Sequence, residues 1–447
     1  MPVRTQQLDS DDGFTLVEVI VAMLIFTIIL TGFLYTMTAS LTATRDTRAR
    51  VVAANLASQQ IDVLRSAASP FAVNDNSFDT QLNGDTFHIR VLTEWVTTTG
   101  SAANCEAGAA VASLAYKQVT VEVTWDNMRA GARPVYSDTS LTPRSKINDK
   151  DLGTVLVGVV NAAGTAVAGA TVSLTPAGVA AVTTDSDGCA YLLKVPPGNY
   201  TVTVSKAGHV NEQQIAAPEA TVDVTAGGSS RLSFAYDRAT TYSVSYGSGL
   251  PSGVRIPTYL TTTFLSTYGA FKMPATTNAT TKTFSLYPVA SGYSIVAGAY
   301  AETPENPATS CLAPDPGEWL PAPDKVGTRP GAIGGAAGST VTAGVAMVQV
   351  TLNDANGGAS WPNVRNHLKA VYVGGGAGDP GCAAGMTYTF GDIISSDDAI
   401  VLLPYGTWKL YRGNASAQTT QITSGIVVPA GSSVASGIVV LDPRVAP

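Results

Sequence analysis

The first strong pattern in the chain is an uninterrupted apolar run close to its beginning. The run extends from Phe14 to Leu34 and contains one charged residue, Glu18, near its start. As a helix, its roughly 21 residues would measure ~32 Å, which is enough to cross a lipid bilayer. Because a carboxylate inside a membrane span costs free energy, the presence of Glu18 indicates a specific role for it.

The apolar run continues into a second pattern that has helical spacing. No proline occurs between Phe14 and about residue 65, and Gly32 is the only glycine there. Over residues 36–65 one side of the expected helix is apolar and the other is charged. The apolar positions that recur near this spacing are Leu41, Val52, Leu56 and Val63. We therefore predict one helix of about 52 residues, ~78 Å long, that ends before Pro70.

After residue 70 the pattern changes from helical spacing to alternation. In residues 87–95 and 116–125 most alternate residues are apolar, as in half-buried antiparallel strands. A small sheet packed on the amphipathic half of the helix is the simplest arrangement of these elements. From residue 153 onward, short apolar runs alternate with turns rich in Gly, Pro, Asp and Asn, a pattern that is typical of β-sandwich modules.

The residues at the start of the apolar run resemble the processing site of type IV prepilins. They read Gly13-Phe14-Thr15-Leu16-Val17-Glu18. The resemblance implies that a prepilin peptidase cuts after Gly13 and that Phe14 is then N-methylated. It also implies that Glu18 neutralises the N-terminal amine of a neighbouring subunit in a filament. Two positions depart from the family: Asp12 stands where Lys or Arg is commoner, and Tyr35 stands where many pilins have proline.

Two ordinary interpretations of the apolar run are a secretory signal peptide and an uncleaved membrane anchor. A secretory peptide has a basic segment before its apolar run and small residues at a cleavage site after it. Here the leader holds Arg4 against three aspartates, and the helical pattern continues beyond Leu34. Arginines follow the run, so the positive-inside rule would place the end of the span after Leu34 in the cytoplasm, opposite to the orientation of a prepilin. The prepilin motif is specific enough to outweigh this count of positive charges.

The segment 153–236 resembles the carboxypeptidase-regulatory-like and B-type collagen-adhesin repeats, which are prealbumin-like β-sandwiches. The residues that carry the resemblance are Gly153 to Val160, Gly169 to Leu174, Thr184 to Gly188 and Val195 to Val202. The adhesin branch joins a Lys of its first strand to an Asn of its last strand by an isopeptide bond. Residues 155–160 contain no Lys and residues 232–236 contain no Asn, so we predict no such bond here.

A weak internal repeat indicates more modules of this kind. The order apolar strand, Pro, Gly, aromatic, strand in residues 193–202 recurs in 286–295 and 402–410. The expected fold class is α+β: a long N-terminal pilin helix with a small antiparallel sheet, followed by tandem prealbumin-like β-sandwich modules. The expected parts are a leader (1–13), a transmembrane and filament helix (14–66), a pilin β domain (67–126), a linker (127–152), a carboxypeptidase-regulatory-like sandwich (153–237), a second β module with a long loop at 302–338 (238–344) and a C-terminal β module (345–447).

The four cysteines are an even number in a chain that is expected to be exported, which favours disulfides. Four cysteines allow three pairings. Cys311 and Cys382 both fall in the C-terminal third and are the first choice for one pair. Cys105 and Cys189 would then join two neighbouring modules. No cysteine spacing matches a zinc site.

No catalytic or metal-binding group of residues stands out in the sequence. The three histidines, His88, His209 and His367, are far apart, and no nucleophile elbow is present. The sequence Asp185-x-Asp187-Gly188 begins like a calcium loop, but Lys194 stands where a bidentate Glu is required, so turn geometry explains it better. We therefore expect no enzyme activity, no cofactor and no metal.

Composition limits the partners further. Charged residues make up 13% of the chain, and its formal net charge of −7 would become −5 after loss of the leader, which holds one Arg and three Asp. Such a surface does not attract nucleic-acid phosphates. Trp319 and Trp361 could stack on sugar rings or fill a core, and a core role is preferred. Long loops on rigid modules often carry binding, which directs attention to residues 302–338.

These patterns predict a minor type IV pilin, at the filament tip, that displays β modules for adhesion or surface contact. Its expected partners are other pilin subunits, a prepilin peptidase, the membrane before assembly, and a host-surface or glycan ligand. The precursor is expected in the inner or cytoplasmic membrane and the mature protein in a cell-surface pilus or pseudopilus. Two alternatives remain: a pseudopilin of a secretion or DNA-uptake machine, and a glycan-binding protein anchored by a pilin helix.

Overall fold

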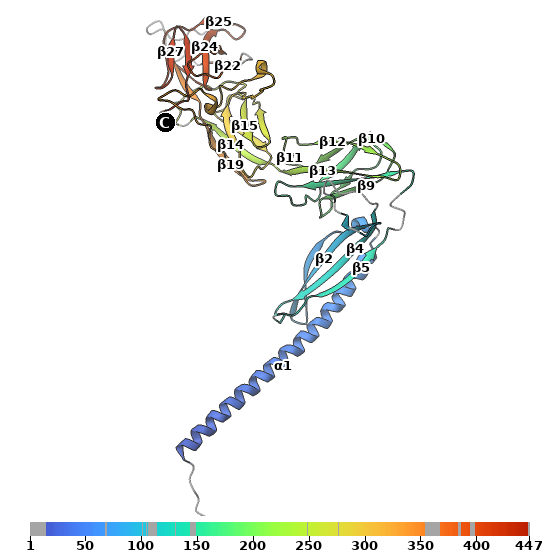
Figure 1. The fold of residues 1–447 in the computed structure, drawn as a ribbon. Helices are drawn as coiled ribbons and strands as arrows, with labels where there is room; N and C mark the ends of the chain where they lie inside the picture. Colours follow the sequence, from blue (N-terminus) through green and yellow to red (C-terminus); the bar gives the residue numbers. More distant parts are fainter. Residues whose placement is uncertain are drawn as a thin grey trace, which may run out of the picture. The chain divides into compact units, whose positions relative to one another are not determined.

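In this computed structural model, one long helix is followed by a series of small β-sheets (Figure 1). The structure describes residues 15–445 except 68, 101, 104, 106–113, 130, 144–148, 248, 276, 354–366, 383–385 and 394–397. Residues 1–104 with 112–149 form one compact unit, and residues 105–111 with 150–447 form a second. The chain therefore has the α+β class that its patterns predict, with a long N-terminal helix and sandwich-like sheets after it.

Helix α1 extends over Leu16–Arg65 and has 50 residues, close to the predicted length. It begins at Thr15, whose hydroxyl accepts a hydrogen bond from the backbone N–H of Glu18 at 3.3 Å. A side-chain cap of this kind satisfies a backbone donor that has no partner within the helix. The lower half of α1, from Leu16 to about Leu34, contains an apolar stretch long enough to cross a membrane, and none of that stretch is buried.

The upper half of α1 packs on a sheet through small residues. Ala49, Ala53, Ala57 and Ile61 are its buried positions. The sequence analysis instead expected Leu41 and Val63 on the buried face, and that was wrong because both side chains are more than half exposed. Alanine has no side chain beyond Cβ, so the sheet can approach the helix backbone closely.

The sheet of the first unit has the order β1-β2-β4-β5, with β3 paired to β2. Its strands are β1 (Asn76–Leu82), β2 (Asp85–Thr97), β3 (Ala102–Ala103), β4 (Leu114–Trp125) and β5 (Val135–Leu141), and the short 3-10 helix η1 (Pro70–Ala72) precedes them. The two strands predicted from alternation are β2 and β4, which pair antiparallel with Phe87 opposite Trp125. Their inward side chains form one core with the upper half of α1.

The first module of the second unit has two four-stranded sheets, with the orders β12-β10-β7-β8 and β11-β13-β6-β9. Its strands are β6 (Gly153–Val160), β7 (Thr171–Thr175), β8 (Val182–Thr183), β9 (Cys189–Val195), β10 (Gly198–Ser205), β11 (His209–Asn211), β12 (Glu219–Val224) and β13 (Ser229–Arg238). The first and last strands, β6 and β13, pair in parallel. A compact set of buried side chains, mostly Val and Leu, forms its core.

The rest of the second unit contains four more sheets, with the orders β17-β14-β19, β16-β15-β18, β23-β20-β26 and β22-β21-β24-β28-β27, and β25 paired to β24. The elements are β14 (Thr240–Tyr246), β15 (Thr262–Ser266), β16 (Gly269–Met273), β17 (Thr281–Leu286), β18 (Ser294–Ala297), η2 (Pro307–Thr309), η3 (Pro316–Glu318), β19 (Thr340–Val345), β20 (Val348–Asn353), β21 (His367–Tyr372), β22 (Thr387–Asp392), β23 (Asp398–Leu403), β24 (Gly406–Gly413), β25 (Gln418–Gln421), β26 (Ile426–Val427), β27 (Ser433–Ala435) and β28 (Ile438–Leu441).

These last sheets share one core. A single cluster of buried side chains extends from Tyr242 on β14 to Leu441 on β28, and Val210 of β11 also belongs to it. Backbone hydrogen bonds connect the sheets as well: the N–H of Arg255 donates to the carbonyl of Ile400 at 3.0 Å, and the N–H of Leu402 donates to the carbonyl of Arg255 at 2.9 Å. The ranges 238–344 and 345–447 are therefore packed together as one body.

Candidate functional site

The N-terminal part of α1 carries the residue on which the assembly hypothesis depends. Glu18 lies in the first turn of α1, and its carboxylate oxygen Oε2 is 3.5 Å from the Thr15 hydroxyl. The side chain is exposed, as are the large apolar residues that follow it. A carboxylate on the first turn is favoured by the helix dipole. Gly13 and Phe14, the predicted processing residues, lie outside the described part of the chain.

Both disulfides lie in the second unit, and they join the pairs that the sequence analysis chose first. Cys105 is bonded to Cys189, the first residue of β9, and Cys311 is bonded to Cys382. Cys105 belongs to the short segment 105–111, which groups with the second unit although it lies between β3 and β4 in the sequence. The backbone of Cys105 lies so close to Gly158 that a Cβ on that glycine would meet the Cys105 carbonyl at 2.3 Å.

The long loop at 302–338 is anchored in the second unit around Asp315, whereas its residues 304–309 and 328–332 are exposed. Asp315 is fully buried, and its carboxylate accepts hydrogen bonds from the Arg329 guanidinium at 2.5 Å and from the Gly317 N–H at 2.9 Å. A buried charge requires a partner of this kind. This part of the loop is therefore a structural element of the second unit.

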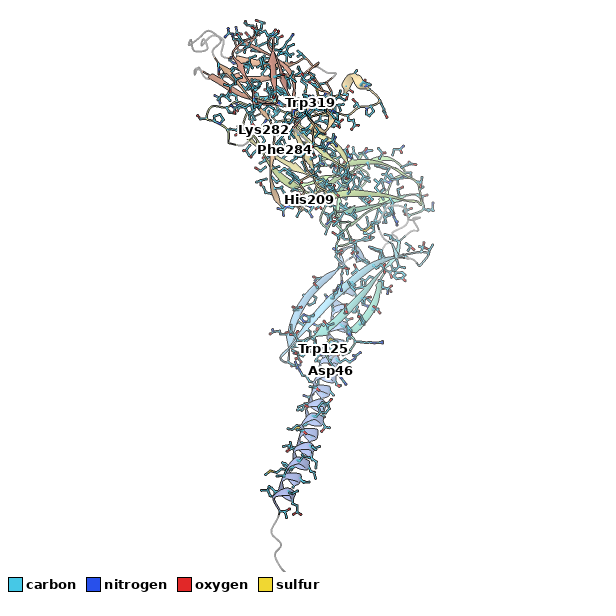
Figure 2. The ribbon with its side chains drawn as sticks, turned by 60° about the vertical axis from the view of Figure 1, so that its left-hand side comes forward. Asp46, Trp125, His209, Lys282, Phe284 and Trp319 are labelled. Atoms are coloured by element: carbon cyan, nitrogen blue, oxygen red, sulfur yellow. A yellow bond between two sulfur atoms is a disulfide. The ribbon has the colours of Figure 1, made fainter. Side chains whose placement is uncertain are left out.

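Trp319, labelled in Figure 2, is buried in the same loop, with 2% of its surface exposed. Its indole N–H donates to the Ala313 carbonyl at 2.9 Å, and the Arg444 guanidinium lies 5.7 Å from the centre of its ring. Arg444 also donates to the Leu320 carbonyl at 2.6 Å. The preferred core role of Trp319 agrees with this burial, and stacking on a sugar is excluded for it. Trp361 lies outside the described residues.

The histidines do not form a common site. His88 on β2 lies between two carboxylates of the first unit, with Nδ1 2.8 Å from Asp79 and Nε2 3.2 Å from Asp126. These hydrogen bonds, first that to Asp79 and then that to Asp126, raise the pKa of His88. His209 lies in the second unit, where its ring contacts that of Tyr236. Among the residues that the structure describes, no group of three or more His, Cys, Asp or Glu side chains could hold a metal ion.

Turn geometry accounts for the sequence that begins like a calcium loop. The Asp185 carboxylate oxygen Oδ1 accepts hydrogen bonds from the backbone N–H groups of Asp187 and Cys189, at 3.1 and 2.9 Å. Gly188 in this turn has a positive φ of 70°, a conformation that glycine adopts without strain. The Asp185 side chain therefore shapes the turn before β9.

Lys282 on β17 is a buried cation that the sequence analysis did not single out. Only 6% of the residue is exposed, and its ammonium lies 5.2 Å from the centre of the Tyr246 ring. Burial lowers the pKa of Lys282. The face of an aromatic ring attracts a cation, so the position is explained by packing against Tyr246 (Figure 2 labels Lys282).

Two family models match parts of the chain. The prokaryotic N-terminal methylation motif matches residues 9–34, and the carboxypeptidase regulatory-like domain matches residues 154–237. These matches confirm both resemblances found in the sequence, and the N-terminal part is type IV pilin-like. The methylation motif indicates a structural subunit rather than an enzyme. Comparison with curated proteins gives no match.

Solved structures with similarity to the chain include three bacterial proteins. The Bacillus anthracis TIE protein is 12% identical over 84% of this chain and 72% of its own, with a TM-score of 0.20. A streptococcal ancillary pilin is 11% identical over 63% of this chain and 95% of its own, with a TM-score of 0.19. The major pilin subunit of Bacillus cereus is 12% identical over 62% of this chain and 96% of its own, also with a TM-score of 0.19. At such TM-scores the similarities define no function.

Proposed function

We propose that this protein is a minor type IV pilin that displays its β modules at the filament tip for adhesion or surface contact. The observation that carries the proposal is the methylation motif at residues 9–34, which includes the apolar and uncovered first half of α1. The precursor would be held in the inner or cytoplasmic membrane by this half. A prepilin peptidase would cut after Gly13, and Phe14 would become the methylated N-terminus of a surface filament subunit.

Glu18 would position the subunit within the filament. In the isolated chain its carboxylate is exposed, but among packed helices it would lose its contact with water. A buried carboxylate is strongly unfavourable unless a positive group pairs with it. The N-terminal amine of a neighbouring subunit would supply that group, so the ion pair would set how far one helix is shifted along another.

The size of the second unit supports a place at the tip. Its main segment, residues 150–447, holds about 300 residues. A body of this size is difficult to place repeatedly along a shaft in which subunits lie close together. At the tip no subunit lies above it, so a single copy is accommodated. The sheets after residue 238 share one buried core, which suits display of a surface away from the cell.

The tip position is tested by immunogold labelling of intact cells with antibodies against residues 153–447. We expect label at filament ends and loss of surface attachment when the gene is deleted. Label spread along the shaft would contradict the tip position, and unchanged attachment would contradict the adhesive role. Loss of secretion or DNA uptake with attachment preserved would identify the protein as a pseudopilin instead.

The ligand is sought separately with the intact protein on a glycan array and on host-cell surfaces. Specific binding of a sugar by a protein that never enters filaments would support the alternative of a glycan-binding protein anchored by its helix. Binding by filament-borne protein would support the pilin proposal and would identify what the modules contact.

A further inference from the structure

The last sheet of the second unit, β22-β21-β24-β28-β27, has an outer face that points away from the core. Its strands β22, β24, β25 and β27 are labelled in Figure 1. Ala370 on β21 and Leu410 on β24 are fully buried in the shared core. Because side chains alternate along a strand, Lys369, Lys409 and Tyr411 lie on the opposite, outer face. All three are partly exposed there.

The pairing of the strands shows which side chains of the outer face are neighbours. In one row across the face, Lys369 of β21 lies opposite Tyr411 of β24. In the next row, Lys409 lies between Val371 of β21 and Ile438 of β28. Lys369 and Lys409 are therefore diagonal neighbours on adjacent strands, ~7–8 Å apart at the backbone. Two cations and an aromatic ring are thus within reach of a single bound group.

Neither lysine is neutralised by the part of the chain that the structure describes. The Lys369 ammonium lies 5.5 Å from the centre of the Tyr411 ring, which attracts a cation but leaves its charge in place. Among the described side chains, no carboxylate forms an ion pair with Lys369 or Lys409, whereas Lys325 is 3.7 Å from Asp442. Like charges on adjacent strands repel each other. A bound anion would remove that repulsion.

The neighbours of the two lysines indicate what else the anion carries. Tyr411, Val371 and Ile438 present apolar surface that is partly exposed on the same face. The exposed hydroxyls of Thr387 and Thr389 on β22 can both donate and accept hydrogen bonds. A sugar ring that bears a carboxylate has the matching features: a negative group, an apolar face of C–H groups, and hydroxyls.

Other classes of anion match this face less well. Nucleic acids bind through many phosphate contacts, and this face offers only two lysines among the described residues, in a chain of net charge −7. A free phosphate would pair with the lysines but leave the apolar side chains without a contact. Small ligands are usually enclosed in a pocket, whereas an open sheet face suits a polymer that crosses several strands.

We propose that the outer face of the last sheet binds an acidic polysaccharide. Lys369 and Lys409 hold the carboxylates of its uronic acid units, and a sugar ring stacks on Tyr411. The inference rests on the proposed function, because it names the class of ligand that the displayed β modules contact. Salt weakens attraction between exposed charges, so the binding is salt-dependent.

Binding of the purified full-length protein to immobilised polygalacturonate, a polymer of uronic acids, tests the ligand class. Dextran is the neutral sugar control, polyglutamate carries carboxylates without sugar rings, and double-stranded DNA carries phosphates. We expect a Kd for polygalacturonate at least about tenfold lower than for each control, and a rise of about fivefold or more between about 0.05 M and about 0.5 M salt. No saturable binding to polygalacturonate, or equal binding to any of the three controls, would overturn the proposal.

Matched substitutions locate the site. Lys369→Gln and Lys409→Gln should each raise the Kd about fivefold or more, whereas Lys409→Arg should retain binding because it keeps the charge. Tyr411→Ala should weaken binding about tenfold, and Tyr411→Phe should not, because it keeps the ring. The control is Lys272→Gln, at an exposed lysine on β16, which should bind like the native protein. Native binding by both Lys→Gln variants of the outer face would overturn the site.

Attachment of filament-bearing cells separates this inference from the proposed function. The double variant Lys369→Gln with Lys409→Gln should attach about tenfold less to a surface coated with polygalacturonate. Its recovery in sheared filaments, with an N-methylated Phe14, should be unchanged. Normal attachment of this variant would overturn the inference and leave the proposed function intact. Protein that stays in membranes yet binds polygalacturonate through these lysines would contradict the proposed function and support the saccharide site.

Discussion

The two halves of α1 differ in burial: the upper half packs on a sheet, and the lower half is exposed. The upper half buries Ala49, Ala53, Ala57 and Ile61 against the sheet of the first unit. The lower half carries the larger and more apolar side chains, yet they are all exposed. For example, Phe26 and Ile29 are 65% and 64% exposed. The residues with most hydrophobic free energy to gain are therefore the ones that the folded chain leaves uncovered.

Within this single helix, the upper half contributes to folding of the first unit and the lower half is available for assembly. The upper half is complete once the sheet has packed on it, so changes there should alter the stability of the first unit. No described residue covers the lower half, so changes there should alter insertion into a membrane or a filament. Large exposed apolar surfaces of this kind are typical of interaction sites rather than of independent soluble proteins.

The strongest test of the lower half removes its carboxylate. In Glu18→Ala and Glu18→Gln the neighbouring N-terminal amine would have no negative partner in the filament, so recovery in sheared filaments should fall at least about tenfold. Thermal unfolding of the first unit should be unchanged. The matched control is Glu305→Gln, an exposed glutamate of the second unit. Normal filament recovery of both Glu18 variants would remove the assembly role.

The converse test places a charge in the upper half. Ala53 is fully buried, so Ala53→Asp forces an unpaired carboxylate between helix and sheet. We expect a loss of about 3 kcal/mol or more in the free energy of unfolding of the first unit, measured by denaturant titration. Val51→Asp, at a position 58% exposed on the same half, should cost less than about 0.5 kcal/mol. Similar losses for both variants would mean that the sheet does not cover this face.

A change in the second unit should leave both halves of α1 unaffected. The disulfide between Cys105 and Cys189 closes a sequence separation of 84 residues. Replacing both cysteines by Ser should lower the stability of the second unit by about 2–4 kcal/mol, because the unfolded chain gains freedom. Filament recovery is the control readout and should not change. A shift in the unfolding of the first unit instead would show that the disulfide supports the helix-bearing unit.

The smallest expected effect is a pH dependence of the first unit. The carboxylates of Asp79 and Asp126 raise the pKa of His88 in the folded protein, so their stabilising contribution is fully present below the unfolded pKa of about 6.5. It is lost as the pH rises through the folded pKa. Paired denaturation curves at pH 5.5 and pH 8.5 should therefore show a slightly greater stability at the lower pH, and His88→Gln should abolish that difference. A larger stability at pH 8.5 in the native protein would contradict the assignment.

Much of this organisation follows from local sequence patterns. The unbroken apolar run predicts the helix, alternation predicts β2 and β4, and turn residues predict the first module of the second unit. These signals are strong because each depends on neighbouring residues alone. The position of Cys311 and Cys382 within one region also sufficed to choose that pair.

Contacts between distant segments account for what the sequence did not reveal. Three of the four buried positions of α1 are alanines, which resemble surface residues until a sheet is known to lie on them. Trp319 is covered by Arg444, which lies 125 positions later in the chain.

The most direct test of the account is the N-terminal mass of the protein in sheared surface filaments. The account predicts a chain that begins at N-methylated Phe14, because the lower half of α1 would then be processed and assembled. An intact start at Met1 or Pro2, with the protein found only in membranes, would contradict it and would leave α1 as a simple anchor for the β modules.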